Sequence, residues 1–323
     1  MSERWEPGAG QTKPLPPFPV IVGPTAVGKT AVAIGIAEAL NGEVVSADSR
    51  QIYRGMEIGS GAPSMEERAR VKHYLIAEIE PDVRLSAGEF ARMARVRIDE
   101  VRARGKQPIV VGGSGLYVRA LLDGLAPMPP ANPTLRREIE AEIDRRGMEA
   151  MIRELTQFDP DYAVKVGLRD RKRLVRALEV LRLTGKPFSR WHKPSQEPWC
   201  QASIFGLARP RPELLQLIER RIRGMIEAGW IEEIKALAGN YGGLERLPSP
   251  VTEALGYKQL IRYLKGEVGL NGAEVEILIA TRQFAKRQMT WFHADHRIRW
   301  LEESGDAAVK RWQKQIIRNL GTL

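Results

Sequence analysis

The chain has 323 residues, 43% of them apolar and 28% charged, a composition typical of a folded protein that excludes wholesale disorder. Fifty Lys and Arg against 40 acidic residues make a net charge of +10, which favours a polyanionic partner or a phosphorylated substrate. The single cysteine, Cys200, excludes an internal disulfide and a cysteine-based metal centre, and no apolar run is long enough for a membrane span. We therefore expect a cytoplasmic monomer of about two domains, without a membrane partner.

The first part of the chain alternates strands with helices. Residues 1–17 are rich in proline and glycine and are predicted to form a flexible tail. The elements predicted after it are a strand at 19–22, a glycine-rich loop at 23–30, a helix at 31–40, a strand at 43–47, a helix at 89–104 and a strand at 107–111. Each strand leads into a polar or glycine turn at its carboxyl end, where open α/β sheets bind their ligands.

The pattern changes after residue 121. A proline-rich linker at 126–133 precedes a capped, charged helix at 134–146, and no strand is predicted before Trp199. A strand at 204–208 and a mainly helical segment from 251 follow. The sequence thus predicts an α/β fold, in which a P-loop core has a parallel sheet flanked by helices. Residues 18–121 and 204–323 form this core, and residues 122–203 form an inserted all-helical domain.

The loop at 23–30 reads GPTAVGKT and fits the phosphate-binding pattern G-x-x-x-x-G-K-[ST]. Its glycines let backbone amides surround phosphate oxygens at the start of a helix, Lys29 adds a positive charge, and the Thr30 hydroxyl is a candidate ligand for Mg²⁺. The predicted phosphate or diphosphate site consists of Gly23, Pro24, Thr25, Ala26, Val27, Gly28, Lys29 and Thr30.

An acid follows the second strand, where it would stand beside the phosphate loop. Asp48 could ligate Mg²⁺ or act as a general base, and the alternative is a solvated acid that caps the next helix. The third strand ends in Gly-Gly-Ser at 112–114 rather than in the acid that a hydrolytic NTPase normally has there.

Six motifs in a fixed order resemble the tRNA dimethylallyltransferase family, over nearly the whole of residues 20–301. They are GPTAVGKT (23–30), SADSRQIYRGMEIG (46–59), VGGSGLY (111–117), RLVRALE (173–179), GYKQ (256–259) and TRQFAKRQMTWF (281–292). Two departures are visible: Ser114 stands where the family usually has threonine, and Ala62 replaces a common lysine before Pro63.

The resemblance implies transfer of a dimethylallyl group from its diphosphate to the exocyclic N6 amine of adenosine 37, beside the anticodon, in tRNAs that read codons beginning with U. It implies Mg²⁺ as cofactor, the tRNA anticodon stem-loop and dimethylallyl diphosphate as partners, and a tRNA-binding role for the inserted domain. The catalytic residues would be Asp48 as base, Lys29, Thr25 and Ser114. The implied tRNA-binding residues are Asp48, Ser49, Arg50, Gln51, Ser114, Arg136, Lys172, Arg173, Leu174, Val175, Arg176, Gly256, Tyr257, Lys258, Gln259, Lys286, Arg287 and Trp291.

A basic run lies within the predicted insertion. Residues 165–193 contain ten Lys or Arg against two acids, a run that forms either a solvated helix face or a surface for RNA phosphates. Two other functions share the phosphate loop. A small-molecule or nucleotide kinase would bind ATP or GTP tightly and use these arginines on a transferring phosphoryl group, and a nucleotide-controlled RNA-binding switch would leave its RNA unmodified.

Overall fold

The computed structural model describes residues 17–126, 128–192, 199–200 and 202–321. The chain divides into two compact units: a core unit of Met1–Leu122 with Pro198–Leu323, and a helical unit of Asp123–Glu197. The predicted boundaries were 121/122 and 203/204, so the chain re-enters the core earlier than its strand pattern indicates. Trp199 explains the difference, because its amide donates a hydrogen bond to the carbonyl oxygen of Leu122 and its ring packs on Phe18.

Six strands of the described chain form one parallel sheet in the order β3-β2-β4-β1-β5-β6. Central β1 pairs with β4 on one side and β5 on the other, so that Val20 is aligned with both Val110 and Ile204. The strands are β1 (Phe18–Val22), β2 (Gly42–Ser46), β3 (His73–Tyr74), β4 (Gln107–Gly112), β5 (Ala202–Ala208) and β6 (Arg299–Glu302). Because all are parallel, their carboxyl ends meet at one edge.

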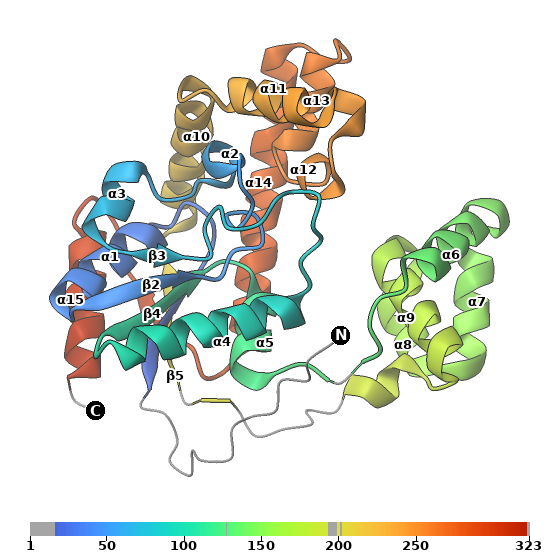
Figure 1. The fold of residues 1–323 in the computed structure, drawn as a ribbon, viewed down its shortest axis with the longest axis horizontal. Coiled ribbons are helices and arrows are strands. Elements are labelled where there is room, and N and C mark those ends of the chain that lie inside the picture. The colour runs from blue at the N-terminus through green and yellow to red at the C-terminus, as the bar shows by residue number, and fades with distance from the viewer. Residues whose placement is uncertain (1–16, 127, 193–198, 201, 322–323) are drawn as a thin grey trace. The chain divides into compact units, whose positions relative to one another are not determined.

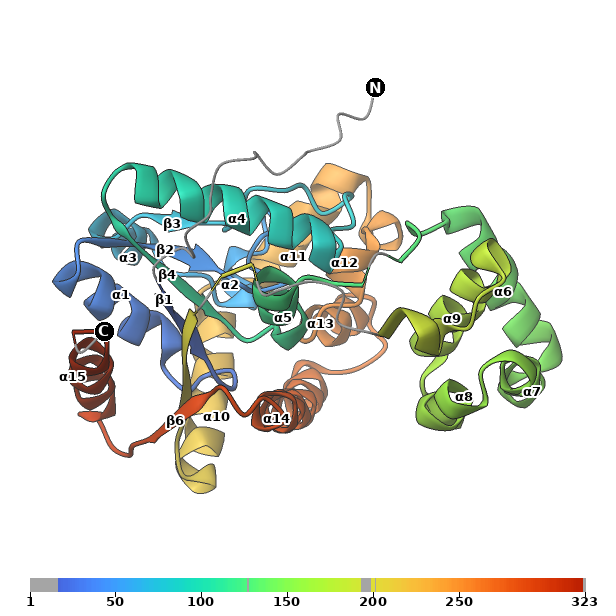
Figure 2. The ribbon, with the colours of Figure 1, turned by 90° about the horizontal axis from the view of Figure 1, so that it is seen from below.

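Helices cover both faces of this sheet, with α4 on one face and α1 and α15 on the other (Figures 1 and 2). Helix α1 consists mainly of small apolar residues because it lies between the sheet and α15. The helices of the core unit are α1 (Lys29–Ala39), α2 (Glu57–Ser60), α3 (Met65–Arg70), α4 (Ala87–Ala103), α5 (Gly115–Asp123), α10 (Arg211–Glu227), α11 (Trp230–Tyr241), α12 (Ser249–Thr252), α13 (Tyr257–Leu264), α14 (Leu270–His293) and α15 (Ala308–Leu320), with a 3-10 turn η3 (Leu244–Arg246).

The helical unit has its own apolar core. Asn132 starts its first helix by accepting hydrogen bonds from the amides of Thr134 and Leu135, and Asp170 caps its last α-helix in the same way through the amide of Arg173. Its elements are α6 (Pro133–Arg146), α7 (Met148–Phe158), α8 (Pro160–Val166), η1 (Gly167–Arg169), α9 (Arg171–Thr184) and η2 (Phe188–His192).

The predicted fold class is confirmed, since a parallel sheet flanked by helices accompanies a unit in which the described residues form helices and no strand. Two strands were not predicted. β3 has two residues, and β6 lies at the sheet edge with both ends exposed, so neither produces a run of apolar residues. The expected tail lies outside the described residues except for residue 17. In the described chain, no helix combines the length and apolarity that crossing a membrane requires.

Candidate active site

The loop between β1 and α1 has the backbone shape of a phosphate site. Gly23 and Gly28 have φ angles of 147° and 111°, and Ala26 adopts the left-handed region at 64°. A Cβ atom at Gly23 would lie 2.7 Å from the carbonyl oxygen of Leu207 on β5, so glycine allows the loop to lie close to the sheet. Gly28 is the N-cap residue of α1 and has no side chain that could accept a hydrogen bond. Within the described chain, the first amides of this helix are therefore available to an anion.

Lys29 is the first residue of α1, and its side chain extends across this loop. Its Nζ donates hydrogen bonds to the carbonyl oxygens of Gly23, at 3.0 Å, and Pro24, at 2.7 Å. Burial and the neighbouring charge of Arg221 lower the pKa of Lys29 to about 7, whereas Asp48 acts in the opposite direction. An incoming phosphate would favour the protonated amine, because opposite charges stabilise each other.

Arg221, on α10, adds a second cation that nothing in the sequence singles out. Its charge lowers the pKa of Lys29, and the charge of Asp48 raises the pKa of both, so the three groups lie within electrostatic range of one another. Arg221 Nη2 donates a hydrogen bond of 3.1 Å to the carbonyl oxygen of Gly61. In the sequence this residue stands beside other arginines of an amphipathic helix, and only the packing of α10 distinguishes it from them.

Asp48 follows β2 at the carboxyl edge of the sheet. Its Oδ1 accepts hydrogen bonds from the amides of Arg50, at 2.8 Å, and Gln51, at 3.4 Å. No residue of the described chain donates a hydrogen bond to Oδ2. One carboxylate oxygen therefore shapes the turn, as the capping alternative anticipated, and the other is available for chemistry.

Hydrogen bonds connect the loops that follow β2 and β4. The Ser49 amide donates to Ser114 Oγ at 3.0 Å, which places the Ser114 hydroxyl beside the Asp48 turn. Ser46 Oγ donates to Gln51 Oε1 at 2.9 Å, and Gln51 Nε2 donates to the carbonyl oxygen of Gly61 at 3.0 Å. The structure thus brings together the predicted residues of these two loops and the phosphate loop at one edge.

The donor set at this edge suits Mg²⁺. Thr30 is partly exposed in the first turn of α1, and its hydroxyl has no hydrogen-bond partner in the part of the chain that the structure describes. Together with Asp48 Oδ2 it offers hard oxygen ligands, which Mg²⁺ accepts alongside phosphate oxygens and water. The described residues contain no cluster of three acidic, His or Cys side chains, so a bound cation would need oxygens from a phosphorylated substrate as well.

Helix α14 presents its basic residues outward near the same edge. Lys286 and Arg287 are exposed and form no ion pair with any described residue, and Arg287 lies over the Phe284 ring at 5.9 Å. The Trp291 side chain is 41% exposed, although its ring edge packs so closely on Gly115 that a Cβ there would lie 2.1 Å from it. These three predicted RNA contacts therefore share one accessible helix end.

The GYKQ motif is mostly structural. Gly256 has a φ of 88° and lies against Trp230, and Tyr257 is buried with its hydroxyl donating to Glu233 at 2.6 Å. Gln259 accepts a hydrogen bond from the Gly256 amide, which leaves Lys258 as the exposed member of the motif. Arg50, also a predicted RNA contact, donates through Nη1 to the carbonyl oxygen of Pro250.

In the helical unit, two predicted RNA-binding arginines hold a buried acid. Arg136 makes a two-pronged ion pair with Glu179 at 2.9 and 3.0 Å, and Arg176 contacts both Glu179 and the carbonyl oxygen of Pro129. Burial opposes ionisation of Glu179, but hydrogen bonds from Arg136, Arg176 and the Asn132 amide outweigh it and hold the pKa of this acid below its usual value. These arginines thus fasten the linker onto α9.

The other predicted residues of α9 divide between its two faces. Leu174 and Val175 are buried in the core of the helical unit, whereas Lys172 and Arg173 are exposed. Arg173 Nε lies 3.3 Å from Asp170, an exposed ion pair that solvent weakens. The outer face of α9 is therefore where an RNA phosphate could bind.

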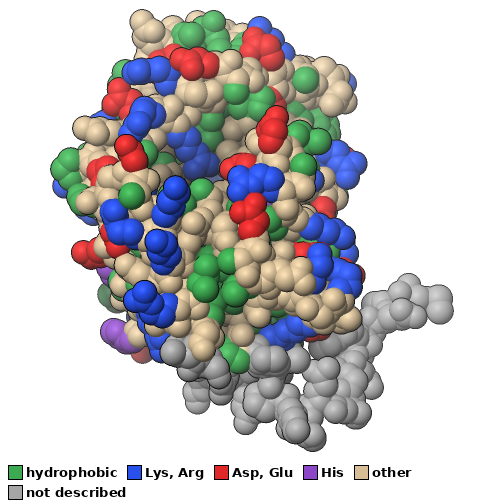
Figure 3. All heavy atoms as spheres, turned by 90° about the vertical axis from the view of Figure 1, so that its left-hand side faces the viewer, with side chains coloured by type: hydrophobic (Ala, Val, Ile, Leu, Met, Phe, Trp, Pro, Cys, Tyr) green, Lys and Arg blue, Asp and Glu red, His purple; other side chains and the backbone are tan. Residues whose placement is uncertain are grey.

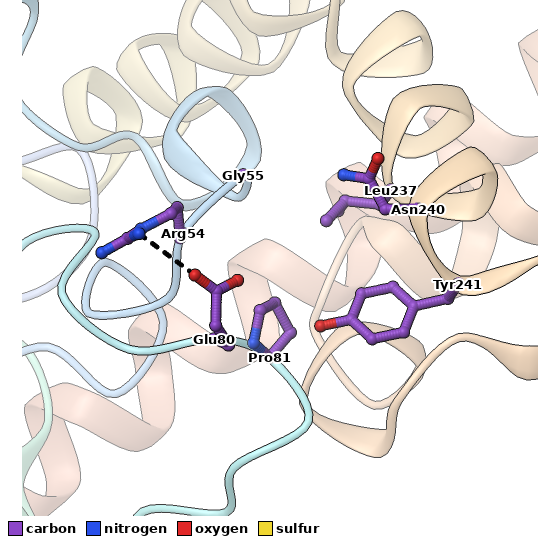
Figure 4. Close-up of a pocket in the computed structure, with 7 residues that line it drawn as sticks. All are labelled: Arg54, Gly55, Glu80, Pro81, Leu237, Asn240 and Tyr241. Atoms are coloured by element: carbon purple, nitrogen blue, oxygen red, sulfur yellow. Dashed lines mark ion pairs between the residues drawn. The ribbon is translucent and has the colours of Figure 1, made fainter.

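The surface also carries a pocket and basic side chains outside the set of site residues described above. A pocket of about 370 Å³ is lined by Arg54, Gly55, Glu80, Pro81, Leu237, Asn240 and Tyr241, and it includes an ion pair between Arg54 and Glu80 (Figure 4). No residue of the phosphate loop lines it.

Lys and Arg side chains are also spread over one face of the core unit among scattered acids, so the basic surplus is not confined to residues 165–193 (Figure 3).

Comparison with known proteins decides the family. The family model described as IPP transferase matches residues 51–295. A tRNA dimethylallyltransferase 2 of Geotalea uraniireducens is 43% identical over 88% of this chain and 91% of its own length. The chain belongs to the tRNA dimethylallyltransferase family. The predicted resemblance and the predicted enzyme class, a prenyltransferase, are confirmed, and the kinase and switch alternatives are set aside.

Further relatives cover the same extent of the chain. A tRNA dimethylallyltransferase of Kocuria rhizophila is 43% identical over 93% of both chains. Among solved structures, a full-length tRNA isopentenylpyrophosphate transferase from Bacillus halodurans has 34% identity and a TM-score of 0.67, covering 95% of this chain and 97% of its own. A eukaryotic dimethylallyltransferase described as acting on tRNA has 25% identity and a TM-score of 0.73, covering 94% of this chain and 77% of its own.

Proposed function

We propose that this protein transfers a dimethylallyl group from dimethylallyl diphosphate to the N6 amine of adenosine 37 in tRNAs that read codons beginning with U. The observation that carries the proposal is that Lys29 of the phosphate loop, the Asp48 turn and Arg221, which shares the Gly61 carbonyl oxygen with Gln51, lie at one sheet edge. Family membership and the relatives that act on tRNA support the choice of substrates.

In this reaction the bond between the prenyl C1 and the diphosphate oxygen breaks, and a bond between C1 and adenine N6 forms. Lys29, Arg221 and the amides at the start of α1 would stabilise the negative charge on the departing diphosphate. Asp48 would accept the proton that the amine loses, through the oxygen that the turn does not use. Thr30 would be the ligand that this chain supplies to Mg²⁺, which neutralises diphosphate charge when bound.

The direct test is mass spectrometry of tRNA nucleosides. After incubation with dimethylallyl diphosphate and Mg²⁺, one five-carbon unit is expected on the adenosine beside the anticodon, and tRNAs that read other codons serve as the control. Absence of any modified nucleoside, or prenylation at another position of the tRNA, would contradict the proposal.

RNA binding by the helical unit is testable through its salt dependence. Replacing Lys172 and Arg173 with alanine is expected to weaken tRNA binding and to reduce the slope of log K against log salt by up to about 1–2, because each phosphate contact contributes slightly less than one. Donor binding should not change. An unaltered slope would show that the basic run at 165–193 is a solvated helix face and not a surface for RNA phosphates.

Arg176→Ala is the matched comparison, because this residue lies on the same helix but faces inward. We expect it to lower the melting temperature, since Glu179 and Pro129 lose a hydrogen-bond donor, with a smaller effect on the salt slope. Thermal unfolding and filter binding distinguish the two roles.

A further inference from the structure

Gln288 lies on the inner face of α14 and joins two loops of the active site. Its side chain is 5% exposed. Its Oε1 accepts a hydrogen bond of 2.8 Å from the Thr25 amide, in the phosphate loop, and its Nε2 donates one of 2.9 Å to the carbonyl oxygen of Gly113, in the loop after β4. One side-chain amide thus connects the ends of β1 and β4.

The two loops that Gln288 joins serve opposite sides of the proposed reaction. The phosphate loop would hold the leaving diphosphate. Gly113 precedes Ser114, whose hydroxyl accepts from the Ser49 amide beside the base, Asp48. The pairing of Val22 with Gly112 brings the starts of these two loops side by side, and Gln288 links them beyond the point where the strands end.

The chemistry of this link requires a side chain that is both a donor and an acceptor, as an amide is. The group must accept from an N–H and donate to a carbonyl oxygen at once, which a carboxylate or a thioether cannot do. Space is also restricted, because a Cβ at Gly113 would lie 2.3 Å from Gln288 Nε2. The outer face of the same helix carries Lys286 and Arg287, so α14 presents cations outward and this amide inward.

We propose that Gln288 is a positioning residue for prenyl transfer, which holds the phosphate loop and the Ser114 loop at the spacing that the reaction needs. The inference rests on the proposed function. Transfer between two bound groups depends steeply on their separation, and a displacement of about 1 Å can cost about 10²-fold in rate. Loss of the link should slow transfer without weakening the binding of either substrate, because the groups that bind them are unchanged.

The test is Gln288→Met, which keeps the side-chain length and removes both hydrogen bonds. The single-turnover rate of prenyl transfer is expected to fall by about 10- to 100-fold. Calorimetric dissociation constants for pyrophosphate and for tRNA are expected to stay within about threefold of wild type. Gln313→Met is the control, because Gln313 Nε2 makes a comparable 2.9 Å hydrogen bond from α15 to the Ala31 carbonyl oxygen; its transfer rate should not change.

Gly113→Ala offers an independent route to the same defect, because the added methyl displaces the Gln288 amide. It should slow transfer like Gln288→Met, and Gly113→Ala combined with Gln288→Ala should be no slower than Gln288→Ala alone. A wild-type rate in Gln288→Met, an equal loss in Gln313→Met, or weakened binding that accounts for the lost rate would overturn the proposal. An inactive wild-type protein would instead reject the proposed function itself, so the two failures are distinguishable.

Discussion

Asp48→Asn is expected to slow prenyl transfer by about 10²–10⁴-fold, the usual contribution of a general base. The substitution is conservative in structure, because an amide oxygen can still accept the hydrogen bonds from Arg50 and Gln51 that shape the turn. It cannot take a proton from the adenine amine. tRNA binding should therefore change far less than the rate.

Single-turnover rates across Mg²⁺ concentration distinguish the two roles of Asp48. If it is the base, the defect should lie in the transfer rate, and added Mg²⁺ should not restore it. If it is a metal ligand instead, added Mg²⁺ should restore part of the rate, and the defect should appear in donor affinity. Asp82→Asn, at an exposed acid, is the control that should keep the wild-type rate. A normal rate in Asp48→Asn contradicts both roles.

Lys29→Ala is expected to reduce turnover by about 10²-fold or more, because its charge stabilises the departing diphosphate more strongly than the bound donor. Arg221 remains in this variant and retains part of the positive charge. Tight tRNA binding should persist, since the RNA would be held mainly elsewhere. Unchanged turnover would remove the phosphate loop from the mechanism.

Lys29 also predicts a pH dependence of donor binding. The pKa of its amine is about 7 in the free protein, and a bound diphosphate would raise this pKa because it stabilises the ammonium form. Between the two values binding takes up a proton, so donor affinity should fall as the pH rises above about 7, by up to about tenfold per pH unit. Calorimetry with pyrophosphate in buffers of different ionisation enthalpy measures this uptake. Lys29→Ala, with the same ligand, should lack that component, and an identical uptake would contradict the assignment.

The predicted and observed elements agree best where the information is local. The phosphate loop is one run of eight residues, and its glycines and lysine are recognisable without any partner from elsewhere in the chain. Helix α6 begins one residue before the predicted range of 134–146 and ends with it, for the same reason. Strands β3 and β6 were missed because edge strands bury too little apolar surface to leave a pattern.

The roles within motifs depended on tertiary structure. Leu174, Val175 and Tyr257 belong to motifs of a tRNA-modifying family, yet they are buried and pack. Arg176 looks like its neighbour Arg173 in the sequence, but it faces Glu179 and not solvent. Helix periodicity predicts a buried face, although it does not say which charged residue has a buried counter-ion.

The sequence by itself determined the fold class and the family, and it identified the candidate phosphate loop and the candidate base, because each rests on residues that are close together or on motifs in a fixed order. Only the tertiary structure revealed Arg221 and Gln288. Gln288 reaches Thr25 across 263 residues, and Arg221 reaches Gly61 across 160. Such contacts form where parallel strands bring distant loops to one edge of the sheet. The local sequence of either segment does not indicate which distant residue it will contact.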